Sequence, residues 1–248
     1  MTREEKSTGF LKQLNKTDNS MLRNFRYLHC IVFIANELSS LLFERIRLEP
    51  RALYKTNWGW WLYGTYVITI AYAHYRHETR GKALGADTSS PFHLWKVCTV
   101  LYEILITDHL IITIFYWTLT HSTLDPPFTY WRIMRHSLPL PLMLIDFAMS
   151  NMLVEMRHIA ATVFYGTCYA SLLVTYTLTQ KPDTIYSWAH LTTAASWAML
   201  GAIIAVMVFS HLILATLSRY RHKNKLATSS NDLAIEADKD SLILIVLP

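Results

Sequence analysis

Six long apolar blocks restrict the fold of this chain more than any other feature of its sequence. A helix needs about 20 apolar residues to cross a hydrocarbon core about 30 Å thick, and a soluble fold rarely contains several such blocks. An open strand would leave its backbone donors and acceptors unsatisfied in lipid, so each block is predicted to be a helix. The predicted spans cover residues 27–43, 54–75, 94–119, 136–154, 159–178 and 193–217. We therefore predict an all-α membrane protein with a bundle of about six transmembrane helices.

The positive charges lie mainly between and outside these blocks. The chain has 23 Lys and Arg residues and a net charge of +5, but charges in these positions flank a bilayer and do not form a nucleic-acid-binding face. No nucleic acid partner is therefore expected. Fifteen of the charges fall on the side that carries both termini and seven on the other, which predicts that both termini are cytosolic. The expected location is the lipid bilayer of the endoplasmic reticulum or the plasma membrane.

The chain divides into three segments on this interpretation. Residues 1–26 are polar and are predicted to form a cytosolic N-terminal segment, and residues 27–217 form the six-helix transmembrane domain. Residues 218–248 form a cytosolic tail that begins basic and turns polar, which predicts disorder because a polar segment buries too little apolar surface to fold.

Four histidines lie towards the cytosolic ends of the predicted spans, which raises the question of haem or a metal. They are His29, His74, His158 and His211. A transmembrane haem pathway would need a second pair of ligands in the other leaflet, and that pair is absent from the sequence. The clustered histidine boxes of a membrane di-iron enzyme are absent too. We therefore expect no cofactor and no metal.

Ionisable residues also occur inside the predicted spans, where each costs a few kcal/mol to insert. They are Glu37, Glu103, Asp108, His109 and Asp146. Such residues face the bundle interior, where they either pair with one another and hold the helices together or mark a functional site.

Thr56 and His136 are a candidate nucleophile and base. A threonine hydroxyl is a poor nucleophile unless a neighbouring base accepts its proton, so catalysis needs a His within hydrogen-bond reach. Thr56 begins the second predicted span and His136 begins the fourth, which places both on the same membrane side. The alternative interpretation of Thr56 is a helix cap, a common role for Thr near a helix N-terminus.

Several short motifs occur in an order and spacing that resemble one known family. They are Thr-Asn-Trp-Gly at 56–59, Ile-Phe-Tyr-Trp at 114–117, His136 with Pro141 and Asp146 after it, Arg-His at 157–158, and Tyr186. Together they resemble the androgen-inducible and rolling-stone-like membrane proteins, whose characterised members include hydrolases of fatty acid esters of hydroxy fatty acids. The resemblance extends over about residues 54–217. It implies a multi-helix membrane protein with a Thr nucleophile and a His base.

The resemblance implies an intramembrane hydrolase whose substrate is a fatty-acyl lipid ester. Thr56 would attack the ester and His136 would accept its proton. Asn57 adjoins Thr56 and is the expected oxyanion donor, since amide donors serve in that role. Asp146 lies ten residues after His136, about 15 Å along a helix, and is assigned a supporting structural or relay role. The hydrolases carry a second His three residues before the catalytic one, where this chain has Ile133, and the rolling-stone branch tends to have Asn at the catalytic position.

Two other functions are compatible with the same sequence. The first is a non-catalytic multi-pass membrane protein, either a rolling-stone-like cell-fusion factor or a subunit of a membrane complex, in which the polar residues only hold helices together. The second is a pathway for protons or a small solute through Glu103, Asp108 and His109.

Overall fold

The regular elements of the described chain are all helical, as predicted. The computed structural model describes residues 20–43, 54–81, 91–120, 130–150, 152–179, 186, 189 and 191–245. The α-helices are α2 (Ser20–Phe43), α4 (Lys55–Gly81), α5 (Pro91–Phe115), α6 (Tyr130–His136), α7 (Pro139–Met149), α8 (Ile159–Thr179) and α9 (Ala194–Ile245). A π-helical turn, η1 (Tyr116–Thr120), follows α5, and a 3-10 turn, η3 (Met156–His158), precedes α8.

Three of the described helical segments are long and apolar enough to cross a membrane. They are Leu94–Thr118, Met156–Thr179 and Ala194–Asn224. The 24 residues of α2 and the 27 of α4 are sufficient in length, but polar residues and tyrosines lower the mean hydropathy of both helices. The structure therefore supports a membrane protein, and the count of six spans stays a prediction.

The fourth predicted span, residues 136–154, differs from the structure, because it contains only the last residue of α6 and the short helix α7. Pro139 and Pro141 have no backbone N–H and their rings would clash with a preceding helical turn, so both are accommodated in the first turn of a new helix, α7, and α6 does not continue into it. The N–H groups of Ser137 and Leu138 instead donate to the Ile133 carbonyl, at 3.0 and 3.2 Å. His136 therefore ends α6 and does not head a long helix. The 11 residues of α7 are about 16 Å long, and extended backbone follows at Ser150.

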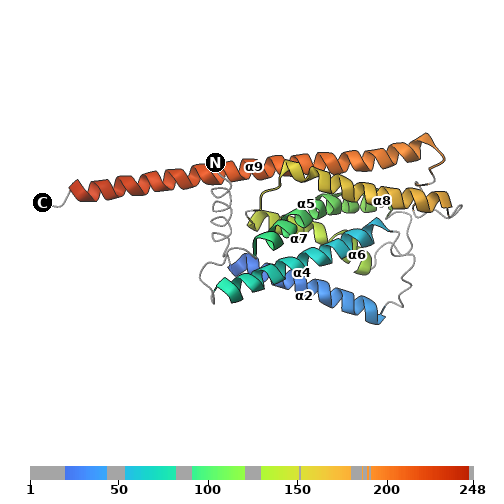
Figure 1. Cartoon of the computed structure of the whole chain (residues 1–248), viewed down its shortest axis with the longest axis horizontal. Coiled ribbons are helices and arrows are strands. Elements are labelled where there is room, and N and C mark those ends of the chain that lie inside the picture. The colour runs from blue at the N-terminus through green and yellow to red at the C-terminus, as the bar shows by residue number, and fades with distance from the viewer. Residues whose placement is uncertain are drawn as a thin grey trace.

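Apart from the short α6, successive α-helices of the bundle run antiparallel to one another, and α5 lies near the centre of the bundle (Figure 1). It packs against α4, α7, α8 and α9, while α2 covers the other side of α4. The Ser20 end of α2 and the C-terminal half of α9 lie at the same end of the bundle (Figure 1). The start of α4, the end of α5 and the start of α9 lie together at the opposite end.

In the structure, α9 continues as one helix through Ile245, over most of the predicted C-terminal tail. The sequence has no Gly or Pro between Gly201 and Pro248, so nothing in it ends the helix. At 52 residues α9 is about 78 Å long and extends well past the bundle (Figure 1).

An aromatic contact joins α2 to α4. Phe33 lies 5.1 Å from the ring of Trp60 and 6.2 Å from that of Tyr63, measured between centroids. The Trp60 indole N–H donates to Glu37, which satisfies one of the carboxylates predicted inside a span. The Phe33 ring lies directly over Gly64, so α2 and α4 approach closely because Gly64 has no side chain.

Gly64→Ala is expected to lower the melting temperature of the purified protein, because the new methyl group would overlap the Phe33 ring. Overpacking of this kind costs about 1–3 kcal/mol, against a gain of up to about 1 kcal/mol from helix propensity. Gly201→Ala is the matched control, since nothing lies within 4 Å of its added Cβ. A Gly64→Ala protein as stable as Gly201→Ala would contradict this contact.

Candidate active site

Thr56 and His136, which are 80 residues apart, are in contact in the structure. The Thr56 Oγ1 atom lies 3.4 Å from Nδ1 of His136. Thr56 is in the first turn of α4 and His136 is the last residue of α6. A hydrogen bond between a nucleophile and its base is often this long before substrate binds, and it shortens in the reacting complex. The two side chains named from the sequence therefore have the geometry of a nucleophile and a base.

His136 is held by the last turn of α5 and by η1, which follows it. Its ring stacks on Tyr116, with centroids 3.6 Å apart and planes 12° from parallel. The Thr113 hydroxyl donates to the His136 carbonyl at 2.8 Å, and the Trp117 indole N–H donates to the Ser137 hydroxyl at 2.9 Å. The stack on Tyr116 fixes the plane of the ring, and the two hydrogen bonds fix the chain at the end of α6.

The surroundings of His136 keep its ring neutral. His136 lies outside the three spanning segments, and burial lowers its pKa to about 3, with smaller contributions from Arg135, His109 and Arg132. A neutral imidazole has one unprotonated nitrogen that can accept a proton. His136 can therefore act as a base at physiological pH.

A buried ion pair lies next to Thr56. Lys55 Nζ is 2.5 Å from Oδ1 of Asp108, and the two side chains are 12% and 0% exposed. The Tyr165 hydroxyl donates to the other oxygen of Asp108 at 3.2 Å, and the Lys55 ammonium lies 3.8 Å from the centre of the Tyr165 ring. Because Lys55 was counted among the charges between the predicted spans, this ion pair was not predicted. The available signal was Asp108 itself, because a carboxylate inside a span requires a cation nearby.

Tyr186 fastens the start of α4 to the chain between α8 and α9. The Lys55 backbone N–H donates to its hydroxyl oxygen at 3.1 Å, and the Tyr169 hydroxyl donates to the same oxygen at 3.2 Å. Burial raises the pKa of Tyr186, so the phenol stays neutral. Its contacts give the Tyr186 of the sequence motif a structural role, one residue away from Thr56.

Asn57 and Ile133 flank the contact between Thr56 and His136. Asn57 is 8% exposed, and its backbone N–H donates to the Tyr54 carbonyl at 3.0 Å. Its role as oxyanion donor stays a prediction. Ile133 is 44% exposed on α6, one turn before His136. The position where the hydrolases have their second His therefore lies at the surface of this protein.

Asp146 belongs to a separate cluster in the core. Arg26 binds it through two nitrogens, at 2.7 and 3.1 Å, and the Tyr66 hydroxyl donates to it at 2.8 Å. Arg26 also contacts His74 Nε2 at 3.0 Å. Arg26 was predicted in the polar cytosolic segment, but it lies inside α2 and is 3% exposed, because Asp146 compensates its charge. Asp146 thus binds α2 and α4 to α7.

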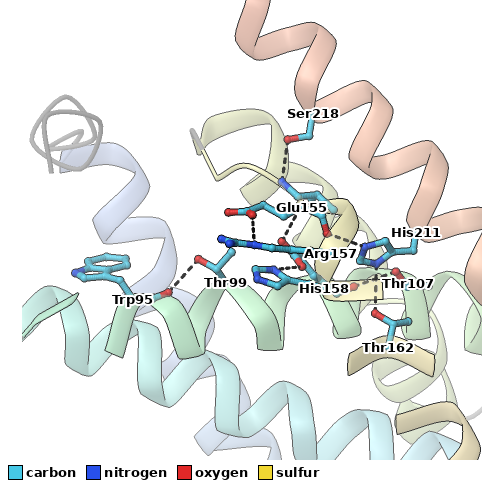
Figure 2. A network of polar contacts seen from close by, with 11 residues as sticks. Trp95, Thr99, Thr107, Glu155, Arg157, His158, Thr162, His211 and Ser218 are labelled. Atoms are coloured by element: carbon cyan, nitrogen blue, oxygen red, sulfur yellow. Dashed lines mark hydrogen bonds and ion pairs between the residues drawn. The ribbon is translucent and has the colours of Figure 1, made fainter. Parts of the chain in front are cut away.

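A second polar cluster, around Glu103, lies near the other end of α5. Its carboxylate accepts the Glu155 backbone N–H at 2.9 Å and contacts His158 Nδ1 at 2.8 Å. Figure 2 shows His158 and His211 on either side of the turn that leads into α8, with His211 between the Glu155 carbonyl and Thr162. Within the described residues, no group of three or more His, Cys, Asp or Glu side chains could hold a metal ion.

The two clusters on α5 have different partners. Glu103 is bound by the turn before α8, and Asp108 is bound by Lys55 of α4.

Comparison of the chain with models of known protein families, with curated proteins and with solved structures gave no match.

Proposed function

We propose that this protein is an intramembrane lipid ester hydrolase that cleaves fatty acid esters of hydroxy fatty acids. The observation that supports it most is the 3.4 Å contact between Thr56 Oγ1 and His136 Nδ1. The ring stack on Tyr116 holds the His136 imidazole beside Thr56, and its neutral ring has an unprotonated nitrogen that can accept a proton.

The reaction follows the usual course of nucleophilic ester hydrolysis. The Thr56 oxygen bonds to the ester carbonyl carbon while its proton passes to Nδ1 of His136. The tetrahedral intermediate collapses as the bond to the alcohol oxygen breaks, and His136 returns the proton to that oxygen. Water, deprotonated by His136, then attacks the acyl-Thr56 ester and releases the fatty acid. Each proton taken by His136 is returned, so no other reactant is needed.

The position of the site fits an amphiphilic substrate. Thr56 and His136 lie at the end of the bundle where the spanning segment Leu94–Thr118 ends. Tyr54 and Trp61, two residues before and five residues after Thr56 in the sequence, are 43% and 46% exposed, and aromatic rings of this kind favour the headgroup level of a bilayer. An ester group could lie at that level while its acyl chains stay in the hydrocarbon.

The test uses the wild-type protein in detergent, with a fluorophosphonate probe and a branched fatty-acyl ester. We expect covalent labelling of the peptide that contains Thr56, located by mass spectrometry, and release of the free fatty acid. Wild-type protein that neither reacts with the probe nor hydrolyses the ester would refute the proposal. Labelling of another residue with no label on Thr56 would refute the assigned nucleophile.

A further inference from the structure

The outward side of α9 carries a line of apolar side chains along its spanning segment, Ala194–Asn224. Phe209, Ile213 and Leu217 follow one another at intervals of four residues, and all three are exposed. Side chains four residues apart lie on one face of a helix, so the line is continuous. Exposed apolar side chains of a spanning helix face the acyl chains of the bilayer. This line therefore marks the part of α9 that lies in the hydrocarbon.

Basic residues follow the apolar line in the next turns of α9. Arg219 and Lys223 are exposed and lie four residues apart, so they form a basic turn with both charges on one face. Tyr220, in the same turn, is 65% exposed, and a tyrosine ring is typical of the headgroup level of a bilayer. Along the outward side of α9, apolar side chains thus give way to one aromatic and two basic side chains, as at the boundary between hydrocarbon and headgroups.

Arg221 fixes the orientation of this basic turn. Its guanidinium donates to the backbone carbonyl of Phe147 in α7 and, at 3.3 Å, to that of Met152 just after α7. It also lies 4.3 Å from the centre of the Phe147 ring. Two residues correspond to about 200° of rotation around a helix axis. Because Arg221 is bound to the bundle, Arg219 and Lys223 are turned away from it.

The carboxylates described at this end of the bundle are already in contact with basic side chains. The pairs are Asp146 with Arg26, Glu103 with His158, and Glu155 with Arg157. In the described part of the chain, none of these carboxylates pairs with Arg219 or Lys223. The basic turn therefore carries an excess of positive charge that fits a partner of opposite charge.

We propose that the basic turn of α9 binds the phosphate-bearing headgroups of anionic phospholipids. If both termini are cytosolic, as predicted, the turn lies at the cytosolic leaflet, which carries phosphatidylserine and phosphoinositides. Guanidinium and ammonium groups form charge-assisted hydrogen bonds to phosphate oxygens, and a basic cluster next to a spanning helix attracts anionic lipids. Arg219 and Lys223 lie on an open helix surface where α9 leaves the bundle, so a headgroup reaches them without a cavity (Figure 1).

The test measures lipid binding by the whole chain, purified in detergent and titrated with phosphatidylserine or phosphatidylcholine in native mass spectrometry. The wild type is expected to bind phosphatidylserine more tightly than phosphatidylcholine. The double variant Arg219→Gln with Lys223→Gln should lose about 25-fold in affinity for phosphatidylserine at low salt, a factor of about five for each basic residue. Its melting temperature should not change, because both side chains are exposed. Arg219→Lys keeps the charge and should retain the affinity.

The matched control is Lys96→Gln with Arg157→Gln, which removes one Lys and one Arg from the same end of the bundle. Both side chains are exposed, so the net charge changes equally in the two double variants. The control should keep the preference for phosphatidylserine. Equal affinity of the wild type for the two lipids, or an equal loss in both double variants, would overturn the proposal. Heparin that binds the wild type more tightly than phosphatidylserine would also overturn it, because the partner would then be a soluble polyanion. None of these outcomes depends on ester hydrolysis.

Discussion

Replacing Asp146 by Leu is expected to destabilise the protein by about 3–5 kcal/mol, because it leaves the Arg26 guanidinium buried without its counter-charge. Arg26 makes two bonds to this carboxylate, at 2.7 and 3.1 Å, and is 3% exposed. The measurement is thermal unfolding in detergent, followed by tryptophan fluorescence. The loss is expected to be large because α2 and α4 both reach α7 through Asp146.

The control is the double variant Arg26→Met with Asp146→Leu, which removes both charges together. It is expected to recover most of the lost melting temperature, because apolar residues of similar size replace a buried ion pair at little cost. Tyr66→Phe, which removes one neutral donor to the same carboxylate, should cost only about 1–3 kcal/mol. If the single variant Asp146→Leu were as stable as the double variant, the ion pair would not hold these helices together.

The helices α4, α5 and α8 were predictable because each apolar block is long and bounded by polar or turn residues. The start of α2 was not predictable. Arg26 is expected in a loop unless its partner Asp146, 120 residues away in the sequence, is known. The break before Pro139 was predictable in principle. Both prolines are visible in the sequence, but the apolar residues around them continue without interruption and were interpreted as one span.

The contact between Thr56 and His136 shows what order along the chain can and cannot predict. Alternation of the spans predicted that both residues lie on one side of the membrane. For the two residues to be in contact, α4 must also pack against α6. That packing depends on complementary side chains, which the spacing of the motifs along the sequence does not reveal. The same reason explains why Lys55 was missed as the partner of Asp108.

The roles of His109 and Asp146 could not be separated by sequence, because both are ionisable residues in apolar surroundings. The structure distinguishes them by their partners. Asp146 accepts three bonds from Arg26 and Tyr66, whereas the His109 ring packs against Tyr63 and lies beside Gly59 of α4. Asp146 therefore holds three helices together, and His109 lies between two.

Thr56→Ala is expected to abolish both probe labelling and ester hydrolysis, because the variant has no hydroxyl to form the acyl-enzyme. His136→Ala should reduce kcat by about 10²–10⁴-fold, the usual contribution of a general base. Thr56→Ser keeps a hydroxyl at the same place and should retain labelling. Initial rates with the branched ester, measured at equal amounts of folded protein, give these comparisons.

Thr65→Ala is the matched control, since Thr65 is also on α4 and its exposed hydroxyl donates only to the Trp61 carbonyl of its own helix, at 3.0 Å. It should match the wild type in rate and labelling. The alternative interpretation of Thr56 as a helix cap makes a different prediction, in which Thr56→Ala loses about 1 kcal/mol of stability and keeps its activity. The two interpretations of Thr56 thus predict different activity and different stability for Thr56→Ala. Comparing Thr56→Ala with Thr65→Ala therefore distinguishes a catalytic contact with His136 from a structural one.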